Sequence, residues 1–251
     1  MVYERLLKTI EARKAHLTLI DPDKQPPLVA GRIACEAERA GTDGIMIGGS
    51  TATDGSVVEK TCQAVRERCT IPTILFPGSP KGLTDKADAV FYISLLNSRD
   101  PYFITGAHAQ SARILKKLGV EVISVGYIIV EPGQTVGRLG RARLIPRDRP
   151  DLASAYAMVA EFFGMKCVYL EAGSGAERPV PAKLIEAVKD SVKIPLIVGG
   201  GVRTVEDARL VADAGADIVV QGSAVEEDSG ANRRVAAVIE YLRSGAPPAA
   251  K

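Results

Sequence analysis

The chain has 251 residues, a length that suits one large domain or two small ones. Its 46% apolar and 25% charged residues are ordinary for a soluble globular protein, and a net charge of +2 lacks the basic excess typical of nucleic-acid binding. The four cysteines form no CxxC pair, and neither a signal peptide nor a membrane-spanning apolar stretch is recognisable. We therefore expect a cytoplasmic protein with reduced thiols, no transmembrane segment and no nucleic-acid partner.

The predicted elements alternate between strand and helix after a helical pattern over residues 1–16. Apolar strand segments are predicted, in chain order, within 16–21, 41–49, 71–78, 89–97, 119–127, 164–172, 194–201 and 215–223. Apolar residues at three-and-four spacing predict helices over 26–40, 104–118, 151–163, 181–192 and 204–214. The strands are nearly continuously apolar, which is typical of a parallel sheet buried on both faces.

This alternation predicts an α/β protein with a (β/α)8 TIM barrel. The rival fold is a doubly wound sheet, which usually has fewer strands and a glycine-rich turn after the first of them. Here the glycine-rich turn follows the seventh predicted strand instead. Residues 79–89 are too few for a full crossover helix, so the third helix of the ring is expected to be modified or missing. We expect one domain over residues 1–245 and a disordered tail over 246–251.

The seventh and eighth predicted strands end in glycine. The first of these ends reads PLIVGGG over residues 195–201 and contains Gly200 and Gly201, and the second contains Gly222 and Ser223. Barrel enzymes often bind phosphate with the loops after strands seven and eight, where bare N–H groups favour an anion. The alternative is that these glycines only form tight turns. Thr204 is expected to cap the helix that follows.

Carboxylates follow two other strands. Asp21 ends the first strand and, with Ser50 after the second, offers oxygen ligands of the kind that Mg²⁺ prefers. The alternative for Asp21 is a turn residue, because Asp-Pro often opens turns. Glu171 ends the sixth strand, where a carboxylate can accept a proton from an alcohol, and Tyr169 lies on the same strand face. A buried ion pair for Glu171 and plain core packing for Tyr169 are the alternatives.

Several motifs together resemble those of the geranylgeranylglyceryl phosphate synthase family. They are HLTLIDPDK, GTDGIMIGGS, FYISLLNS, GYIIVEPG, YLEAGSGA, IVGGGVR and the QGS end, and the likeness runs from Arg13 to Leu242. The resemblance implies a (β/α)8-like barrel with a modified third helix. It also implies a Mg²⁺-dependent prenyltransferase of archaeal-type ether lipid synthesis, which joins the 3-hydroxyl of sn-glycerol 1-phosphate to geranylgeranyl diphosphate and releases pyrophosphate.

The same resemblance assigns residues to roles. Asp21 and Ser50 match the metal positions, and Glu171 and Tyr169 are the catalytic candidates. The implied glycerol-phosphate site comprises Tyr169, Leu170, Glu171, Ala172, Gly173, Ser174, Gly175, Gly200, Gly201, Gly222 and Ser223. The strand segments LFPG, FYISLLN and YIIVEPG are candidate walls for the prenyl chain.

The resemblance further implies a homo-oligomer, either a dimer or a hexamer, and leaves room for peripheral membrane contact. The alternatives are the same reaction with a longer prenyl donor, another phosphate-binding barrel enzyme such as an isomerase or lyase, and a non-catalytic barrel that binds a phosphorylated metabolite. The last would keep the glycine-rich ends but have no use for Asp21 and Glu171.

Overall fold

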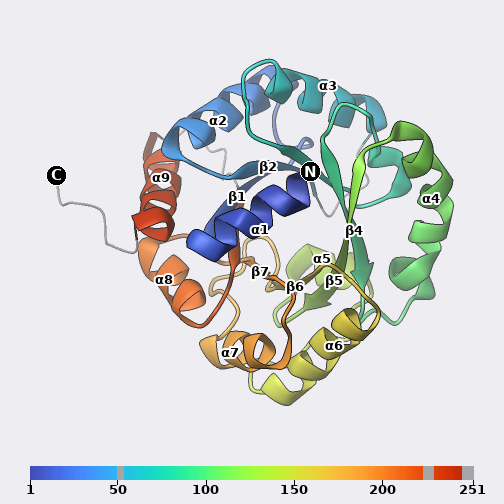
Figure 1. Ribbon diagram of the computed structural model, residues 1–251, viewed down its shortest axis with the longest axis vertical. Coiled ribbons are helices and arrows are strands. Elements are labelled where there is room, and N and C mark those ends of the chain that lie inside the picture. Colours follow the sequence, from blue (N-terminus) through green and yellow to red (C-terminus); the bar gives the residue numbers. More distant parts are fainter. Residues whose placement is uncertain (50–53, 223–228, 245–251) are drawn as a thin grey trace.

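The computed structural model describes residues 1–49, 54–222 and 229–244, and it confirms the predicted barrel (Figure 1). Eight parallel strands close on themselves in chain order, with β8 pairing back onto β1, so the doubly wound alternative is wrong. The strands are β1 (Ala15–Ile20), β2 (Gly44–Gly48), β3 (Thr73–Phe76), β4 (Ala89–Leu95), β5 (Glu121–Ile129), β6 (Cys167–Glu171), β7 (Leu196–Gly199) and β8 (Ile218–Gly222).

Most strands are apolar on both faces because each face meets a different core. Alternate residues such as Leu17, Ile123 and Ile197 fill the barrel interior. The residues between them pack against the surrounding helices, as Val168 and Val198 do. This two-sided burial is the reason that the strands read as continuous apolar runs in the sequence.

Helices surround the barrel and also lie at both of its ends. The described helices are α1 (Val2–Ala12), α2 (Pro27–Ala40), α3 (Gly55–Arg66), α4 (Ala107–Leu118), α5 (Gln134–Leu139), α6 (Pro150–Phe162), α7 (Ala182–Ser191), α8 (Val205–Asp213) and α9 (Ser229–Ser244). The sequence patterns did not predict α3, α5 or α9. No described helix has both the length and the apolarity that a membrane crossing requires.

The connection from β3 to β4 lacks an α-helix, as the shortness of residues 79–89 predicted. It contains only a single 3-10 turn, η1 (Pro80–Gly82). A π-helical turn, η2 (Tyr102–Gly106), leads into α4 on the next connection. The short connection lies beside the cavity described below, whose lining includes Ser79, Pro80 and Leu83.

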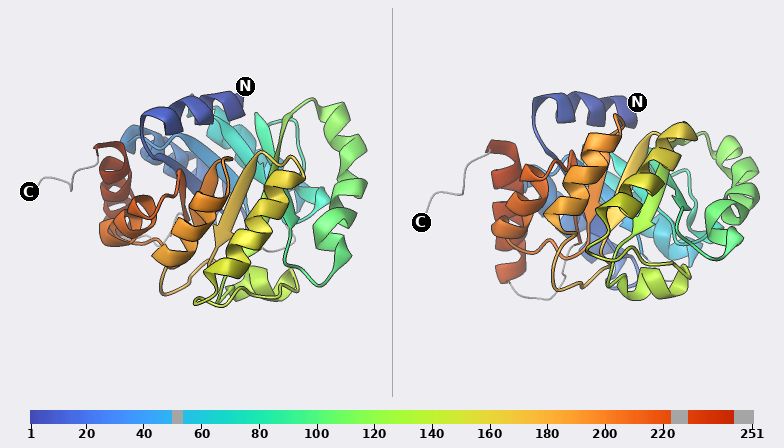
Figure 2. Two further views of the ribbon diagram at one scale, coloured as in Figure 1. Left: turned by 60° about the horizontal axis from the view of Figure 1, so that its bottom comes forward. Right: turned by 90° about the horizontal axis from the view of Figure 1, so that it is seen from below.

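The two ends of the barrel differ. Helix α1 lies across the N-terminal end of the strands, where Val2 and Leu6 join the interior core (Figures 1 and 2). The Glu121 carboxylate at the start of β5 accepts hydrogen bonds from the backbone amides of Val2 and Tyr3. Helix α5 lies at the opposite end, beyond the C-terminal ends of the strands (Figure 2). The N-terminal end is thus closed by packing, and any chemistry at a strand end falls to the other mouth.

Candidate active site

Strand β6 carries the two catalytic candidates into the barrel. Tyr169 is fully buried in the interior core, and Glu171, two residues further along the same strand face, is 6% exposed. Leu170 and Ala172 face the opposite way and pack in the core between the barrel and its helices. These two predicted substrate-binding residues therefore present only backbone to the mouth.

The Glu171 carboxylate is buried without a counter-charge. Its Oε1 accepts a hydrogen bond from the Gly173 amide at 2.7 Å, and its Oε2 accepts one from the Tyr127 hydroxyl at 3.3 Å. No basic side chain of the described residues lies within 4.0 Å of it, so the predicted alternative of a buried ion pair is not observed. Burial raises the pKa of Glu171, and these hydrogen bonds oppose the shift only in part.

Two tyrosines accompany this carboxylate. The rings of Tyr127 and Tyr169 meet edge to face with centroids 5.0 Å apart. The Tyr169 hydroxyl makes no hydrogen bond of good geometry among the described residues. Its pKa is raised well above the ordinary value, mainly by burial and also by the nearby charge of Glu171. A buried hydroxyl without a partner is uncommon, and here it leaves one donor available beside Glu171.

Glycines crowd around Glu171 at the ends of β6 and β7. A Cβ on Gly200 would lie 2.2 Å from Glu171 Oε1 and 2.7 Å from the Gly173 amide nitrogen. A Cβ on Gly201 would lie 2.5 Å from the Arg178 backbone, and all three glycines have positive φ. No other residue type fits these positions. The predicted glycine-rich end is therefore a place where two loops approach closely around the carboxylate.

The loops after β6 and β7 are also tied together at their outer edge. Arg203 donates a hydrogen bond from Nη2 to the Gly175 carbonyl at 2.9 Å, so it fastens the two loops together. Ser174 and Gly175 are both exposed at this rim. Thr204 caps α8 by accepting from the Asp207 amide, as predicted.

Asp21 lies at the same mouth, after β1. Its carboxylate is half-buried against Gly49 at the end of β2, where an added Cβ would lie 2.8 Å from the carboxylate carbon. Asp21 Oδ1 accepts from the Asp23 amide at 3.1 Å, and Lys24 Nζ is 3.9 Å from Oδ2. Burial raises the pKa of Asp21. Two other predicted positions, Ser50 and Ser223, lie outside the described residues, while Gly222 ends β8 with an exposed backbone.

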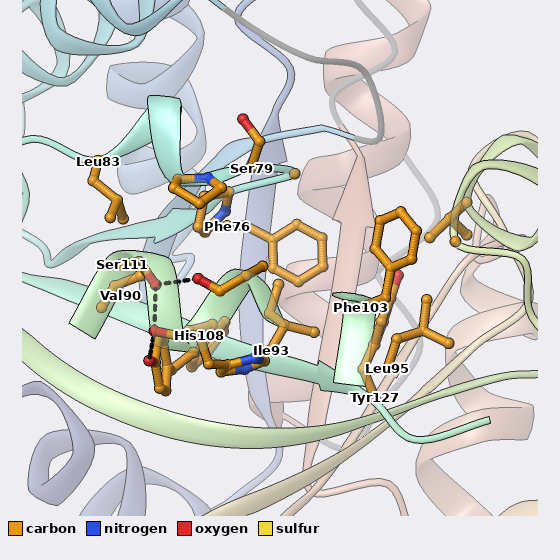
Figure 3. A pocket seen from close by; sticks show the side chains of 18 of the residues that line it. Phe76, Ser79, Leu83, Val90, Ile93, Leu95, Phe103, His108, Ser111 and Tyr127 are labelled. Atoms are coloured by element: carbon orange, nitrogen blue, oxygen red, sulfur yellow. Dashed lines mark hydrogen bonds between the residues drawn. The ribbon is translucent and has the colours of Figure 1, made fainter. Parts of the chain in front are cut away.

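An apolar cavity opens on the other side of Tyr127, between β3, β4 and α4 (Figure 3). Its interior volume is about 120 Å³, and the space continues into the open solvent at its mouth. Two of the three segments predicted as walls for a prenyl chain, LFPG and FYISLLN, line this cavity with side chains that include Phe76, Ile93 and Leu95, whereas the third, YIIVEPG, contributes only Tyr127. Sequence reasoning missed the helical walls, which are Phe103, Ala107, His108, Ser111, Val136 and Leu139.

The imidazole ring of His108, in this wall, lies in apolar surroundings. The His108 ring lies edge-on to Tyr92 at 4.3 Å between centroids, and neither ring nitrogen has a hydrogen-bond partner among the described residues. Burial lowers the pKa of His108, which favours the neutral ring in this apolar wall.

The fold and the site together define a (β/α)8 barrel whose C-terminal mouth joins a buried, glycine-enclosed carboxylate to an apolar cavity. Among barrel proteins this arrangement is typical of enzymes, because the catalytic residues of this fold lie at the C-terminal strand ends. The chain belongs to the PcrB family, whose family model matches residues 8–242.

Named relatives are similar over nearly the whole chain. Geranylgeranylglyceryl phosphate synthase of Methanothermobacter marburgensis is 52% identical over 92% of this chain and 94% of its own length. The same-named protein of Thermococcus gammatolerans is 48% identical over 97% of this chain and 95% of its own length.

A solved structure has the same fold over nearly the whole chain. It is (S)-3-O-geranylgeranylglyceryl phosphate synthase from Thermoplasma acidophilum in complex with the substrate sn-glycerol-1-phosphate. It superimposes with a TM-score of 0.94 at 41% identity and covers 97% of this chain and 98% of its own.

Proposed function

We propose that this chain joins the 3-hydroxyl of sn-glycerol 1-phosphate to a prenyl diphosphate, with geranylgeranyl diphosphate as the donor. Tyr127 is the observation that carries the proposal. Its ring lines the apolar cavity, and its hydroxyl donates to Glu171, which the glycine loops enclose. A hydrocarbon chain and a small polar acceptor can therefore meet at one carboxylate.

The glycine loops are the proposed site for glycerol phosphate. No side chain covers the amides of Gly200 and Gly201 after β7, and bare main-chain N–H groups favour an anion, whereas the Gly173 amide already donates to Glu171. The relative from Thermoplasma acidophilum was solved with this phosphate as its substrate. The carbonyl of Gly175, held by Arg203, keeps the two loops at a fixed separation.

The proposed reaction forms one C–O bond and breaks another. The 3-hydroxyl oxygen attacks C1 of the prenyl group while the bond from C1 to the diphosphate oxygen breaks, and pyrophosphate leaves with that bonding pair. Glu171 orients the hydroxyl and accepts its proton. A strong base is unnecessary because the allylic carbon becomes cation-like as the diphosphate departs, and holding both reactants at one point lowers the barrier further.

We further propose Mg²⁺ as the cofactor, with Asp21 as the one proposed ligand that lies among the described residues. Asp21 is a half-buried carboxylate whose nearest cation, Lys24, is 3.9 Å away, and a hard cation bound there would compensate its burial. Asp21 and Ser50 would hold the ion together with diphosphate oxygens, as is usual for Mg²⁺ at phosphate sites. When bound, the ion would stabilise negative charge on the leaving pyrophosphate.

Three further features complete the proposal. The same reaction with a longer prenyl donor is the alternative, because the depth of the cavity would set the length of the prenyl chain. We also propose that the protein works in the cytoplasm, as a homo-oligomer of two or six copies.

Turnover tests the proposed function directly. The purified chain is incubated with labelled sn-glycerol 1-phosphate and a ladder of prenyl diphosphates, with and without Mg²⁺. We expect labelled product that extracts into organic solvent, most rapidly with geranylgeranyl diphosphate, and a loss of product without the metal. Binding of glycerol phosphate without extractable product from any donor would point instead to a non-catalytic barrel.

A further inference from the structure

The loop that follows β5 carries concentrated positive charge. Residues 132–147 contain four arginines and no acidic residue, although the whole chain is almost neutral. Arg147 has an internal role, because its guanidinium donates to the carbonyls of Glu131 and Pro179. The other three, Arg138, Arg141 and Arg143, are exposed, and α5 carries this loop at the end of the barrel opposite α1 (Figure 2).

A neighbouring loop adds a fourth exposed arginine. Ser98 and Ala142 form an antiparallel bridge, flanked by hydrogen bonds from the Arg99 amide to the Arg141 carbonyl at 3.0 Å and from the Arg143 amide to the Asn97 carbonyl at 2.7 Å. This bridge holds the loop after β4 against the loop after α5. We call the resulting group of Arg99, Arg138, Arg141 and Arg143 the arginine rim.

The arginine rim is largely uncompensated within the part of the chain that the structure describes. Arg141 pairs with Asp100 at 3.4 Å, yet its side chain remains 72% exposed. No carboxylate of the described residues lies within 4.0 Å of Arg99, Arg138 or Arg143. Such a cluster attracts anions over about one Debye length, roughly 8–10 Å at physiological salt.

The rim lies at the entrance of the apolar cavity. Leu139 and Gly140, which lie between Arg138 and Arg141 in the sequence, line the cavity, and Leu139 is 43% exposed. Ser98, next to Arg99, donates its hydroxyl to the Gly140 carbonyl at 2.6 Å. Basic side chains around an exposed apolar residue form the pattern by which proteins bind the interface of an anionic bilayer.

We propose that the arginine rim docks this protein onto an anionic lipid bilayer, with the mouth of the apolar cavity facing the lipid. The proposal rests on the proposed function in one respect: a prenyl donor and an ether-lipid product are both amphiphiles that reside in such a bilayer. Docking by this face would turn α1 and the closed end of the barrel away from the membrane.

Vesicle sedimentation without any substrate tests the proposal. The full chain is mixed with vesicles of phosphatidylcholine alone or of phosphatidylcholine with phosphatidylglycerol, over a range of salt concentrations. We expect binding to the anionic vesicles that weakens as salt is added. Each basic residue near an anionic surface contributes about fivefold to the partition coefficient, so the triple variant Arg99→Gln, Arg138→Gln and Arg143→Gln should bind about 100-fold more weakly.

A matched control changes the same charge elsewhere. Arg5, Arg32 and Arg113 are exposed on α1, α2 and α4 and make no ion pair with a described carboxylate. Their triple replacement by Gln should leave vesicle binding within about threefold of the starting protein. Equal losses in both triple variants would overturn the proposal, as would wild-type binding no stronger to anionic than to neutral vesicles. Rim-dependent binding of an RNA oligonucleotide without vesicle binding would show that the partner class is wrong.

The outcome is separable from that of the proposed function. Turnover in detergent solution needs no bilayer, so we expect the rim variant to keep its activity there while losing vesicle binding. Absence of turnover in a protein that still binds vesicles would reject the prenyltransferase and leave the docking surface in place.

Discussion

The two sides of the barrel mouth are built from opposite kinds of residue, although Tyr127 contacts both of them. On the β6–β7 side, Gly173, Gly200 and Gly201 bring the backbone against a buried carboxylate. On the β3–β4 side, Phe76, Ile93 and other apolar side chains surround an open cavity. The comparison shows that the same barrel end offers main-chain polarity where side chains are absent and an apolar cavity where strand and helix side chains converge.

The largest expected effect comes from replacing Glu171, the carboxylate of the polar side. Glu171→Gln keeps the shape of the residue and its hydrogen bond from Gly173 but removes the proton acceptor. We expect turnover to fall by about 10²- to 10⁴-fold, while the calorimetric dissociation constant for glycerol phosphate changes less than threefold. Equal losses in turnover and binding would show that Glu171 only binds substrate.

The next prediction distinguishes the effect of close contacts around a glycine from the effect of its positive φ. Gly200→Ala places a methyl group 2.2 Å from Glu171 Oε1 at a positive φ of 79°, so we expect glycerol phosphate affinity to fall at least about tenfold. Gly164→Ala is the matched control, since Gly164 has φ of 73° but no atom within 4 Å of an added Cβ. The positive φ should cost both variants about 1–2 kcal/mol of unfolding free energy in thermal or denaturant melts, and the close contacts should cost Gly200→Ala about 1–3 kcal/mol more, while the control should bind normally.

A smaller effect tests the residue shared by the two sides. Tyr127→Phe keeps the ring in the cavity wall and removes the hydroxyl that donates to Glu171. One hydrogen bond to a charged group is worth about 1.5–3 kcal/mol, and its 3.3 Å length places this one at the weak end, so turnover should fall about tenfold. The KM for the prenyl donor should stay unchanged in steady-state assays. A large rise in that KM with normal turnover would mean that the hydroxyl serves the cavity instead.

The smallest effect concerns pH. Burial raises the pKa of Glu171 above its ordinary value of 4.5, so the carboxylate is lost to protonation at a higher pH than for an exposed glutamate. The decrease of kcat/KM for glycerol phosphate on acidification should therefore be centred above pH 4.5. It should be absent from the residual activity of the Glu171→Gln variant. An acid limb that persists unchanged in that variant would assign it to another group, with Asp21 the first candidate because burial also raises its pKa.

The sequence predicted the barrel well because burial on both faces leaves a direct signature in strand composition. It also placed Tyr169 and Glu171 on one strand face, since side chains alternate along a strand. It did not separate Leu170 and Ala172 from them, although these two point into the helix layer. Helix α5 was missed because Gly137 lies within its single short helical segment, and Gly usually argues against a helix.

The contact of Tyr127 with Glu171 shows why part of the site could not be predicted. The sequence predicted the segment YIIVEPG, which begins with Tyr127, only as a candidate wall, and its place beside Tyr169 and Glu171 comes from the pairing of β5 with β6. Contacts of this kind depend on register across strands, which periodicity along one strand does not contain. The helical walls of the cavity were missed for the same reason, because Phe103 and Val136 reach it from separate connections.

Paired equilibrium titrations with glycerol phosphate and an unreactive prenyl thiodiphosphate test the central claim most directly. Gly200→Ala alters the polar side, and Leu95→Trp fills the cavity. The account predicts that the first variant loses glycerol phosphate and keeps the prenyl ligand, while the second does the reverse. A variant that lost both ligands while remaining folded, or prenyl binding that was indifferent to Leu95→Trp, would contradict the division of this mouth into two substrate sites.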